Sequence, residues 1–220
     1  MDTYNKILLQ RCSLFHGLDD EALDSALLLL DAQKKFFERG GFICRLGDRL
    51  HRFGLILSGS AHAFRDDING NRMILANVGP GGTFGESLCY LGCESQVYIC
   101  AVADAEILML STDNLKLPEI LATPIGAELS SRFTAMLAER TLSMNDRIQI
   151  LSRITIREKI NAFLAQFAHK KQGKSFEIPF DRATMAFYLG TDRSAPSREL
   201  GRMRDEGLID FSGNKFKILK

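Results

Sequence analysis

The chain of 220 residues has no long hydrophobic run. Its longest apolar stretches, such as ALLLL at 26–30, fall far short of the roughly 18 residues needed to span a bilayer. The N-terminal stretch MDTYNKILLQRCSLF has no basic segment followed by an apolar one, which is the pattern of a secretion signal. We therefore expect a cytoplasmic protein without a membrane partner.

A regular cysteine framework is lacking as well. The five cysteines are an odd number scattered through one half of the chain: Cys12, Cys44, Cys89, Cys93 and Cys100. In a cytosolic protein this pattern does not indicate a disulfide framework, so we expect free thiols. Cys89 and Cys93, with Cys100 beyond, fit a redox pair or a soft metal site, although small cysteines buried in a core are more common.

No set of residues typical of an enzyme active site is visible. A metal-dependent enzyme of the cupin type carries a His-x-His pair, whereas the segment 60–64 offers His62 alone. No Ser/His/Asp arrangement or pair of carboxylates stands out elsewhere. We therefore do not expect an enzyme, and we keep a cupin-type metalloenzyme as the alternative. No metal or cofactor is predicted.

The net charge of +1 conceals an asymmetry along the chain. Residues 1–151 carry 14 Lys and Arg against 19 Asp and Glu, whereas residues 152–220 carry 14 against 8. A basic C-terminal part of charge +6 behind an acidic part of charge −5 is typical of a nucleic-acid reader joined to another domain. Chance fluctuation on a neutral protein is the alternative.

The first half of the chain reads as helices followed by short strands. Leucines on helical spacing predict that the N-terminal 36 residues are helical, with Asp19 or Asp20 as an N-cap. From about residue 37 to 110, turn signals recur about every 8–12 residues and include an Asn-Gly hairpin turn at 67–71. This spacing favours an antiparallel sandwich or barrel, with strands at 53–57 and 73–75.

Residues 124–151 predict one long helix, because no glycine or proline follows Gly126. An apolar seam, interrupted by Arg140 and Thr141, recurs at threes and fours: Leu129, Phe133, Met136, Leu137, Met144, Ile148 and Leu151. A second copy of the helix is the economical partner for this seam, which predicts a parallel homodimer. A seam packed on its own barrel is the alternative.

The remaining residues predict a helix-turn-helix unit with a wing. A helix over 155–169, a loop over 170–175 and a strand over 176–179 come first. A short helix over 182–189 then ends at Gly190, and Leu200 and Met203 of the next helix face the core. Apolar segments on both sides of Ser212-Gly213-Asn214 predict a tight hairpin, the wing.

Polar side chains gather near the start of the second helix of this unit. The N-terminal end of such a helix can approach base edges in a major groove, where arginine pairs with guanine. Arg202 and Arg204 are suited to phosphate or to pairing with Asp205 and Glu206. We predict a DNA-binding set of six residues: Arg182, Arg193, Ser194, Ser197, Arg198 and Arg202.

Pro196 complicates the start of this helix because it has no backbone N–H. With Asp192 as N-cap, the proline would remove the first intrahelical hydrogen bond. With Ser194 as N-cap it stands at the second position, where nothing is lost. We therefore expect an irregular or late-starting first turn.

The chain resembles the cyclic-AMP receptor protein/FNR family of bacterial transcription regulators over almost its whole length. The stretches that carry the resemblance, besides the long helix, are GLILSGSAHAF, NGNRMIL, GPGGTFGES and YLGTDRSAPSRELGRMRDEGLI. Ser197 and Arg198 match a serine-arginine pair of the family, whereas Ser194 stands where many members have glutamate.

The resemblance implies an α+β fold in three parts. These are an antiparallel β-roll sensor domain of the cyclic-nucleotide-binding type (1–123), a dimerisation helix (124–151) and a winged helix-turn-helix (152–220). It implies a homodimer that binds a palindromic operator in double-stranded DNA, with RNA polymerase as a partner if the protein is an activator. It also implies an effector in the roll that shifts the DNA-binding helices between two arrangements. An effector-independent DNA-binding protein is a further alternative.

The effector itself is unknown, and the resemblance argues against cyclic AMP. Members that bind cyclic nucleotides have a cassette similar to Gly85-Glu86-Ser87 and, about ten residues on, an arginine that pairs with the phosphate. Ser95 and Gln96 stand at that place here. A phosphate buried without a cation is costly, so we expect a different effector; an anionic one would be bound by Arg140, beside Thr141. A pair between Arg140 and an acid of the partner chain is the alternative.

Two cofactors known in the family find little support. Iron–sulfur members have a cluster of N-terminal cysteines, whereas only Cys12 precedes Cys44 here. A haem would need an axial ligand, for which His51 and His62 are candidates, but isolated histidines near strands are usually ordinary hydrogen-bonded residues.

Overall fold

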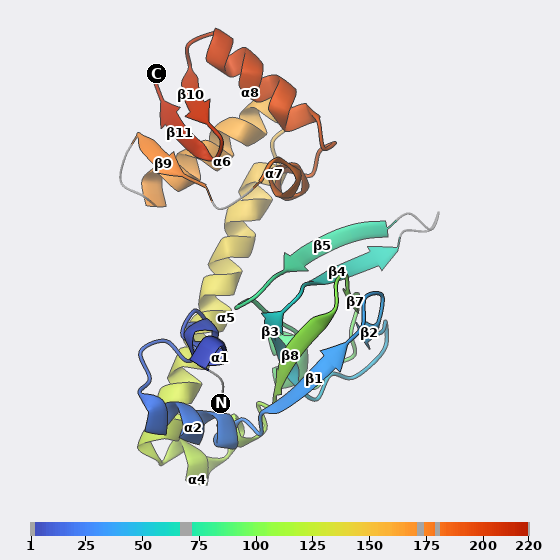
Figure 1. The fold of residues 1–220 in the computed structure, drawn as a ribbon, viewed down its shortest axis with the longest axis vertical. Helices are drawn as coiled ribbons and strands as arrows, with labels where there is room; N and C mark the ends of the chain where they lie inside the picture. Colours follow the sequence, from blue (N-terminus) through green and yellow to red (C-terminus); the bar gives the residue numbers. More distant parts are fainter. Residues whose placement is uncertain (1–2, 67–71, 171–173, 179–180, 220) are drawn as a thin grey trace. The chain divides into compact units, whose positions relative to one another are not determined.

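The computed structural model describes residues 3–66, 72–170, 174–178 and 181–219. The chain divides into two compact units, Met1–Ala138 and Glu139–Lys220 (Figure 1). Antiparallel sheets, a long helix and a helix-turn-helix follow one another along the chain, which confirms the predicted α+β fold. Within the described residues, no helix is both long enough and apolar enough to cross a membrane.

Two four-stranded antiparallel sheets form the roll of the first unit. One sheet has the order β1 (Gln33–Phe37), β8 (Ala105–Leu110), β3 (Phe53–Ser58), β6 (Thr83–Phe84). The other has the order β2 (Phe42–Cys44), β7 (Tyr98–Ala101), β4 (Ala61–Asp66), β5 (Arg72–Val78). The predicted Asn-Gly turn between β4 and β5 lies outside the described residues.

Strands β3 and β8 are buried on both faces because their side chains alternate between two cores. Ile56 and Ile107 point into the core between the two sheets. Leu55 and Leu108 point the other way, into a core shared with helices α1 (Thr3–Leu9) and α2 (Asp20–Leu29). This double burial explains why the sequence of β3 is a continuous apolar run rather than an alternating one.

Asp19 is the N-cap of α2, because its Oδ1 accepts a hydrogen bond from the Ala22 N–H (2.9 Å). One detail of the predicted helical start is wrong. Residues 33–36 belong to strand β1, since they pair with β8. The short helices α3 (Glu86–Leu91), η1 (Asn114–Lys116) and α4 (Pro118–Leu121) complete this unit.

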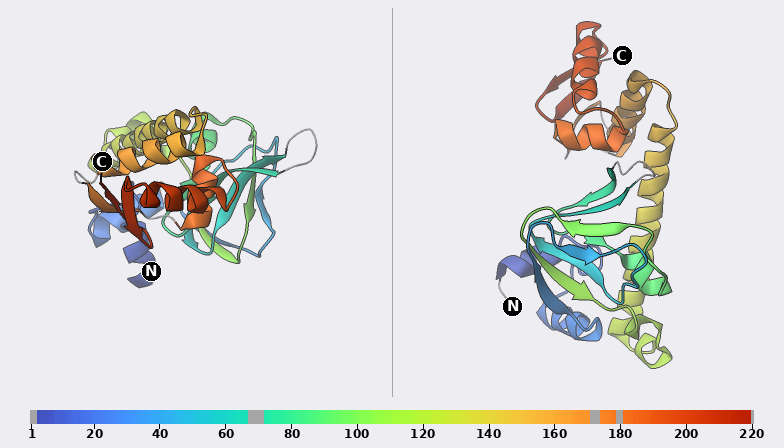
Figure 2. Two further views of the ribbon diagram at one scale, coloured as in Figure 1. Left: turned by 90° about the horizontal axis from the view of Figure 1, so that it is seen from above. Right: turned by 90° about the vertical axis from the view of Figure 1, so that its right-hand side faces the viewer.

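The long helix α5 runs without a break over Pro124–Leu151 (Figure 2). In its first half, Leu129, Phe133 and Met136 are buried in the core beneath the β1-β8-β3-β6 sheet. In its second half, Met144 and Ile148 are exposed. The first half of the predicted seam therefore packs on its own roll, whereas the second half presents apolar side chains to solvent.

The second unit has a three-stranded sheet of order β10-β11-β9 and three further helices. Its elements are α6 (Ile156–Lys170), β9 (Ser175–Glu177), α7 (Arg182–Leu189), α8 (Ala195–Asp205), β10 (Ile209–Ser212) and β11 (Lys215–Ile218). Phe163, Leu200 and Met203 are fully buried in its core, as predicted for the latter two. The β10–β11 hairpin is the predicted wing; residues 171–173 of the predicted loop and Pro179 lie outside the described residues.

Candidate nucleic-acid interface and effector pocket

Helix α7 has both its ends defined by local chemistry. The Oδ1 of Asp181 accepts the Thr184 N–H (2.7 Å), and this hydrogen bond lowers the pKa of the Asp181 carboxyl. Gly190 ends the helix at φ +60°, a left-handed conformation that glycine adopts without strain. The turn between the two helices therefore forms where the sequence predicts it.

Helix α8 starts later than an Asp192 cap would place it. It begins at Ala195, after Ser194, so Asp192 is not its N-cap. Pro196 then stands in the first turn, where its missing N–H breaks no intrahelical hydrogen bond, and the predicted late start is confirmed. The Ser194 hydroxyl makes no capping bond; it accepts a hydrogen bond from Arg198 Nη1 (2.6 Å).

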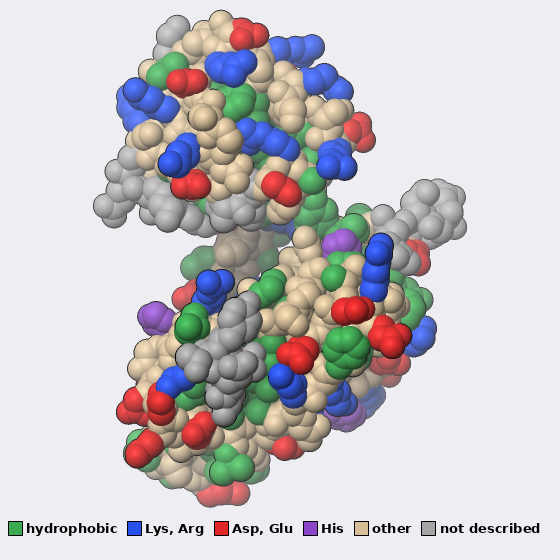
Figure 3. Space-filling model, viewed as in Figure 1, with side chains coloured by type: hydrophobic (Ala, Val, Ile, Leu, Met, Phe, Trp, Pro, Cys, Tyr) green, Lys and Arg blue, Asp and Glu red, His purple; other side chains and the backbone are tan. Residues whose placement is uncertain are grey.

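The structure brings four of the six predicted DNA-binding residues together. Residues from the start of α7 and the start of α8 line an open hollow of about 590 Å³: Asp181, Arg182, Ala183, Arg193, Ser194 and Ser197. Arg198 adjoins this set through its hydrogen bond to Ser194. Other Lys and Arg side chains are spread over the second unit (Figure 3). The DNA-binding role of each residue stays a prediction.

Arg182 is held by the wing. Its Nη2 donates to the carbonyl oxygen of Gly213 (2.8 Å), and its guanidinium lies 5.1 Å from the ring centroids of Phe211 and Phe216. Burial lowers the pKa of this guanidinium, which nevertheless stays protonated. Arg182 therefore joins α7 to the wing, a contact that the sequence alone did not indicate.

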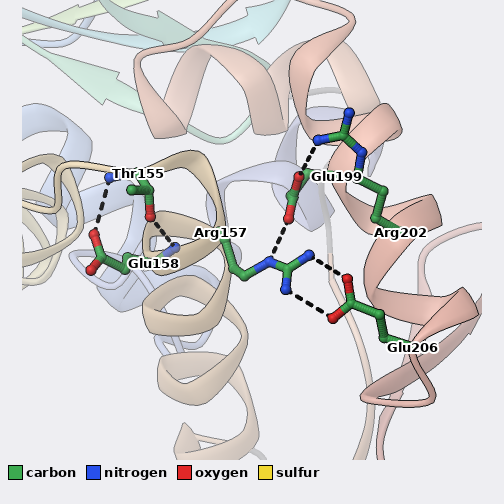
Figure 4. A network of polar contacts seen from close by, with 6 residues as sticks. All are labelled: Thr155, Arg157, Glu158, Glu199, Arg202 and Glu206. Carbon is green, nitrogen blue, oxygen red and sulfur yellow. Dashed lines mark hydrogen bonds and ion pairs between the residues drawn. The ribbon is translucent and has the colours of Figure 1, made fainter.

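Arg202 pairs with a residue other than the ones named as its candidates. Its Nη1 is 3.4 Å from Glu199 Oε2, and, after hydrogen bonding to Arg157, its charge also helps to lower the pKa of the Glu206 carboxyl. Glu206 instead accepts hydrogen bonds from both terminal nitrogens of Arg157, on α6 (Figure 4). The sequence analysis missed Arg157 and Glu199. The pairing of Glu199 with Arg202 could have been predicted, because two residues three positions apart lie on the same face of a helix.

The cassette at the start of α3 has the geometry of a tight turn. Gly85 has φ +80°, where a larger residue is strained, and a Cβ at this position would lie 2.3 Å from Leu50 Cδ2, so the Leu50 side chain would have to shift. Glu86 is buried and accepts a hydrogen bond from the Thr83 hydroxyl. Ser87 is exposed.

Ser95 is engaged by its own turn. It is fully buried, and its Oγ donates to the Val97 carbonyl (2.7 Å) and accepts from the Val97 N–H (3.3 Å). The neighbouring Gln96 is exposed. Arg140 and Thr141 are on the part of α5 that belongs to the second unit, and their place in an effector pocket stays a prediction.

The thiols and histidines do not form a metal centre in the described part of the chain. All five cysteines are free, and Cys93 alone among them is exposed. Burial raises the pKa of the Cys12 and Cys44 thiols, which makes them poor nucleophiles. No group of three or more His, Cys, Asp or Glu among the described residues is placed to hold a metal ion.

Comparison with known proteins identifies both units. Residues 34–116 match the family described as cyclic nucleotide-binding domain, and residues 158–220 match the Crp-like helix-turn-helix domain. The cyclic AMP receptor protein of Thermus thermophilus is 30% identical over 196 residues, which are 89% of this chain and 87% of that protein.

Solved structures share the fold at lower identity. A CooA variant from Carboxydothermus hydrogenoformans aligns with a TM-score of 0.62 at 18% identity, over 88% of this chain and 86% of that one. FixK2 from Bradyrhizobium japonicum aligns with a TM-score of 0.57 at 20% identity, over 86% of this chain and 93% of that one.

Proposed function

The chain belongs to the cyclic-AMP receptor protein/FNR family of DNA-binding transcription regulators, and from this premise we propose that it binds a palindromic operator as a homodimer. Regulators of this family bind DNA and act as dimers. A protein that regulates transcription in this way works in the bacterial cytoplasm, where it meets DNA and, as an activator, RNA polymerase.

The start of α8 reads the operator. The observation that carries this proposal is the clustering of Arg193, Ser194 and Ser197 beside Arg182 around one open hollow. Arg193 and Arg198 are suited to guanine in the major groove, and the serine hydroxyls to phosphates or base edges. Ser194 also holds Arg198 by a hydrogen bond, which limits the directions in which this arginine can reach.

The second half of α5 supplies the dimer contact. Met144 and Ile148 of the predicted seam are both more than half exposed on a helix whose first half is already packed on the roll. Burying these side chains against the same helix of a partner removes apolar surface from water. In functional terms the chain then has three parts: a sensor (1–123), a dimerisation helix (124–151) and a DNA reader (152–220).

The sensor responds to an effector other than cyclic AMP. The Thermus relative carries cyclic AMP in its name, but residues 83–102 of this chain contain no lysine or arginine. Ser95 is fully buried, and its hydroxyl makes two hydrogen bonds to the backbone of Val97. Titration calorimetry with cyclic AMP should therefore show no binding; saturable heat at micromolar ligand would contradict this part of the proposal.

Selection of bound DNA from a random pool tests the proposed function. We expect the full-length protein to enrich a palindrome whose half-sites are about one helical turn apart. Selection repeated with small molecules from a cell extract should change the affinity for the enriched site. Enrichment of no sequence in either condition would overturn the proposal.

A further inference from the structure

Glu199 is a buried carboxylate on the helix that reads DNA. Its side chain is 7% exposed, and it lies between two arginines that come from different helices, Arg157 of α6 and Arg202 of α8 (Figure 4). A carboxylate in such a place needs a cation, because an unpaired buried charge costs several kcal/mol. The two arginines hold Glu199 in very different ways.

Arg157 is fixed both through its backbone, at the capped start of α6, and through the hydrogen bonds of its side chain. It belongs to the first turn of α6, where the Thr155 N–H donates to Glu158 Oε2 (3.0 Å) and the Glu158 N–H donates to Thr155 Oγ1 (3.2 Å). This reciprocal pair is a capping box, which fixes the start of the helix. The Arg157 side chain then uses three nitrogens: Nε donates to Glu199 Oε1 (2.5 Å), and Nη1 and Nη2 donate to Glu206 (2.8 and 2.7 Å).

Arg202 is bound to Glu199 loosely. The single hydrogen bond from its Nη1 to Glu199 Oε2 is 3.4 Å long. Its side chain is 72% exposed, against 37% for Arg157. A long bond from an exposed guanidinium is weak, because water competes for the same N–H groups. Arg202 can thus leave Glu199 at little cost, provided that Glu199 keeps another cation.

We propose that Arg157 is a positioning residue that releases Arg202 for a DNA phosphate. When Arg202 turns from Glu199 to a phosphate, the Arg157 Nε hydrogen bond keeps the buried carboxylate neutralised. Without Arg157, Arg202 becomes the only arginine described at Glu199, and its departure leaves a buried charge unpaired. The inference rests on the proposed function, since it requires that α8 faces DNA.

Salt dependence of DNA binding measures this directly, because each phosphate contact adds about 0.9 to the slope of log affinity against log salt. The selected operator is titrated by fluorescence anisotropy with the parent protein and the variants R202Q, R157Q, R157Q/R202Q and R157Q/E199Q. We expect R202Q and R157Q each to reduce the slope by about 0.9 for every bound subunit. In the double variant R157Q/R202Q, the slope should be reduced by no more than in either single variant.

R157Q/E199Q is the matched control. The E199Q substitution removes the charge of this side chain while nearly keeping its size, so Arg202 is free again and the slope should return to that of the parent. A purely structural role for Arg157 predicts no such rescue. Thermal melting of each variant shows whether the fold is kept.

The outcomes separate this inference from the proposed function. A parent protein that binds no operator refutes the proposed function itself. If the parent has a steep slope and R157Q has the same slope, only the role of Arg157 is refuted. If R157Q does not fold, E199Q is titrated in its place: a loss of slope equal to that of R202Q shows that Glu199 directs Arg202 to DNA and overturns the inference.

Discussion

Arg182 of α7 donates a hydrogen bond to the carbonyl oxygen of Gly213, at the tip of the wing, over 2.8 Å. The two residues are 31 positions apart in the sequence, and the bond joins the start of the helix-turn-helix to the β10–β11 hairpin. The stacking of the same guanidinium over Phe211 and Phe216 strengthens this junction.

Replacing Arg182 by alanine should therefore destabilise the second unit as well as weaken DNA binding. Hydrogen bonds to charged groups and cation–π contacts together account for a loss of about 1–3 kcal/mol. Arg204 is the matched control, because its guanidinium also lies over Phe211, at 5.2 Å. Chemical denaturation should show a loss for R204A of less than about 1 kcal/mol; equal losses for both variants would mean that the bond to Gly213 contributes nothing.

Replacing Arg198 by alanine should weaken binding to the selected operator by about 1–3 kcal/mol and relax the base preference at one position of each half-site. The reason is the loss of a bidentate contact to a base edge. S194A keeps the Arg198 side chain but removes both the acceptor that holds it and the Ser194 hydroxyl that we place at the DNA. Binding to the operator and to unrelated DNA should be compared for both variants, and an equal loss on both DNAs would place Arg198 on a phosphate.

Replacing Ser95 by alanine should destabilise the roll by about 1–2 kcal/mol, because the buried hydroxyl makes two hydrogen bonds to the backbone of Val97. Ser87 is exposed, so S87A should change the free energy of unfolding by less than about 0.5 kcal/mol. Denaturant titration of the two variants distinguishes these cases. No loss in S95A would leave the Ser95 hydroxyl free for a ligand.

Glu158 should make the stability of the second unit depend on pH. Hydrogen bonds from Thr155 lower the pKa of the Glu158 carboxyl in the folded state. The stabilisation is therefore fully present above the ordinary glutamate pKa and is lost as the pH falls through the lowered value. The E158Q side chain can still accept the hydrogen bond but does not titrate. Thermal melting from pH 7 to pH 3 should therefore show that the difference in melting temperature between the parent and E158Q becomes smaller as the pH falls. A difference that stays constant over this pH range would contradict the prediction.

The local signals in the sequence predicted much of the second unit. Gly190 ends α7, and the turn at Gly213 forms the wing. Both features depend only on a local positive φ, which glycine adopts readily. The start of α8 was less certain, since Asp192 and Ser194 are both capping residues; the missing N–H of Pro196 decided between them.

Contacts between distant residues could not be predicted in the same way. Residues 33–36 form a strand only because β8, 70 to 76 positions later, pairs with them. Arg157 meets Glu206 across 49 positions, and Ser95 is buried by the folding of the roll around it. These features arise from tertiary structure, so neither spacing nor propensity reveals them.

The central claim is that α8 binds operator DNA, and the salt dependence of the parent protein tests it most directly. If each subunit of a dimer contacts at least two phosphates, the affinity should fall more than about 100-fold for a fourfold rise in salt, linearly on logarithmic axes. An affinity for the selected operator that does not change with salt would contradict the account.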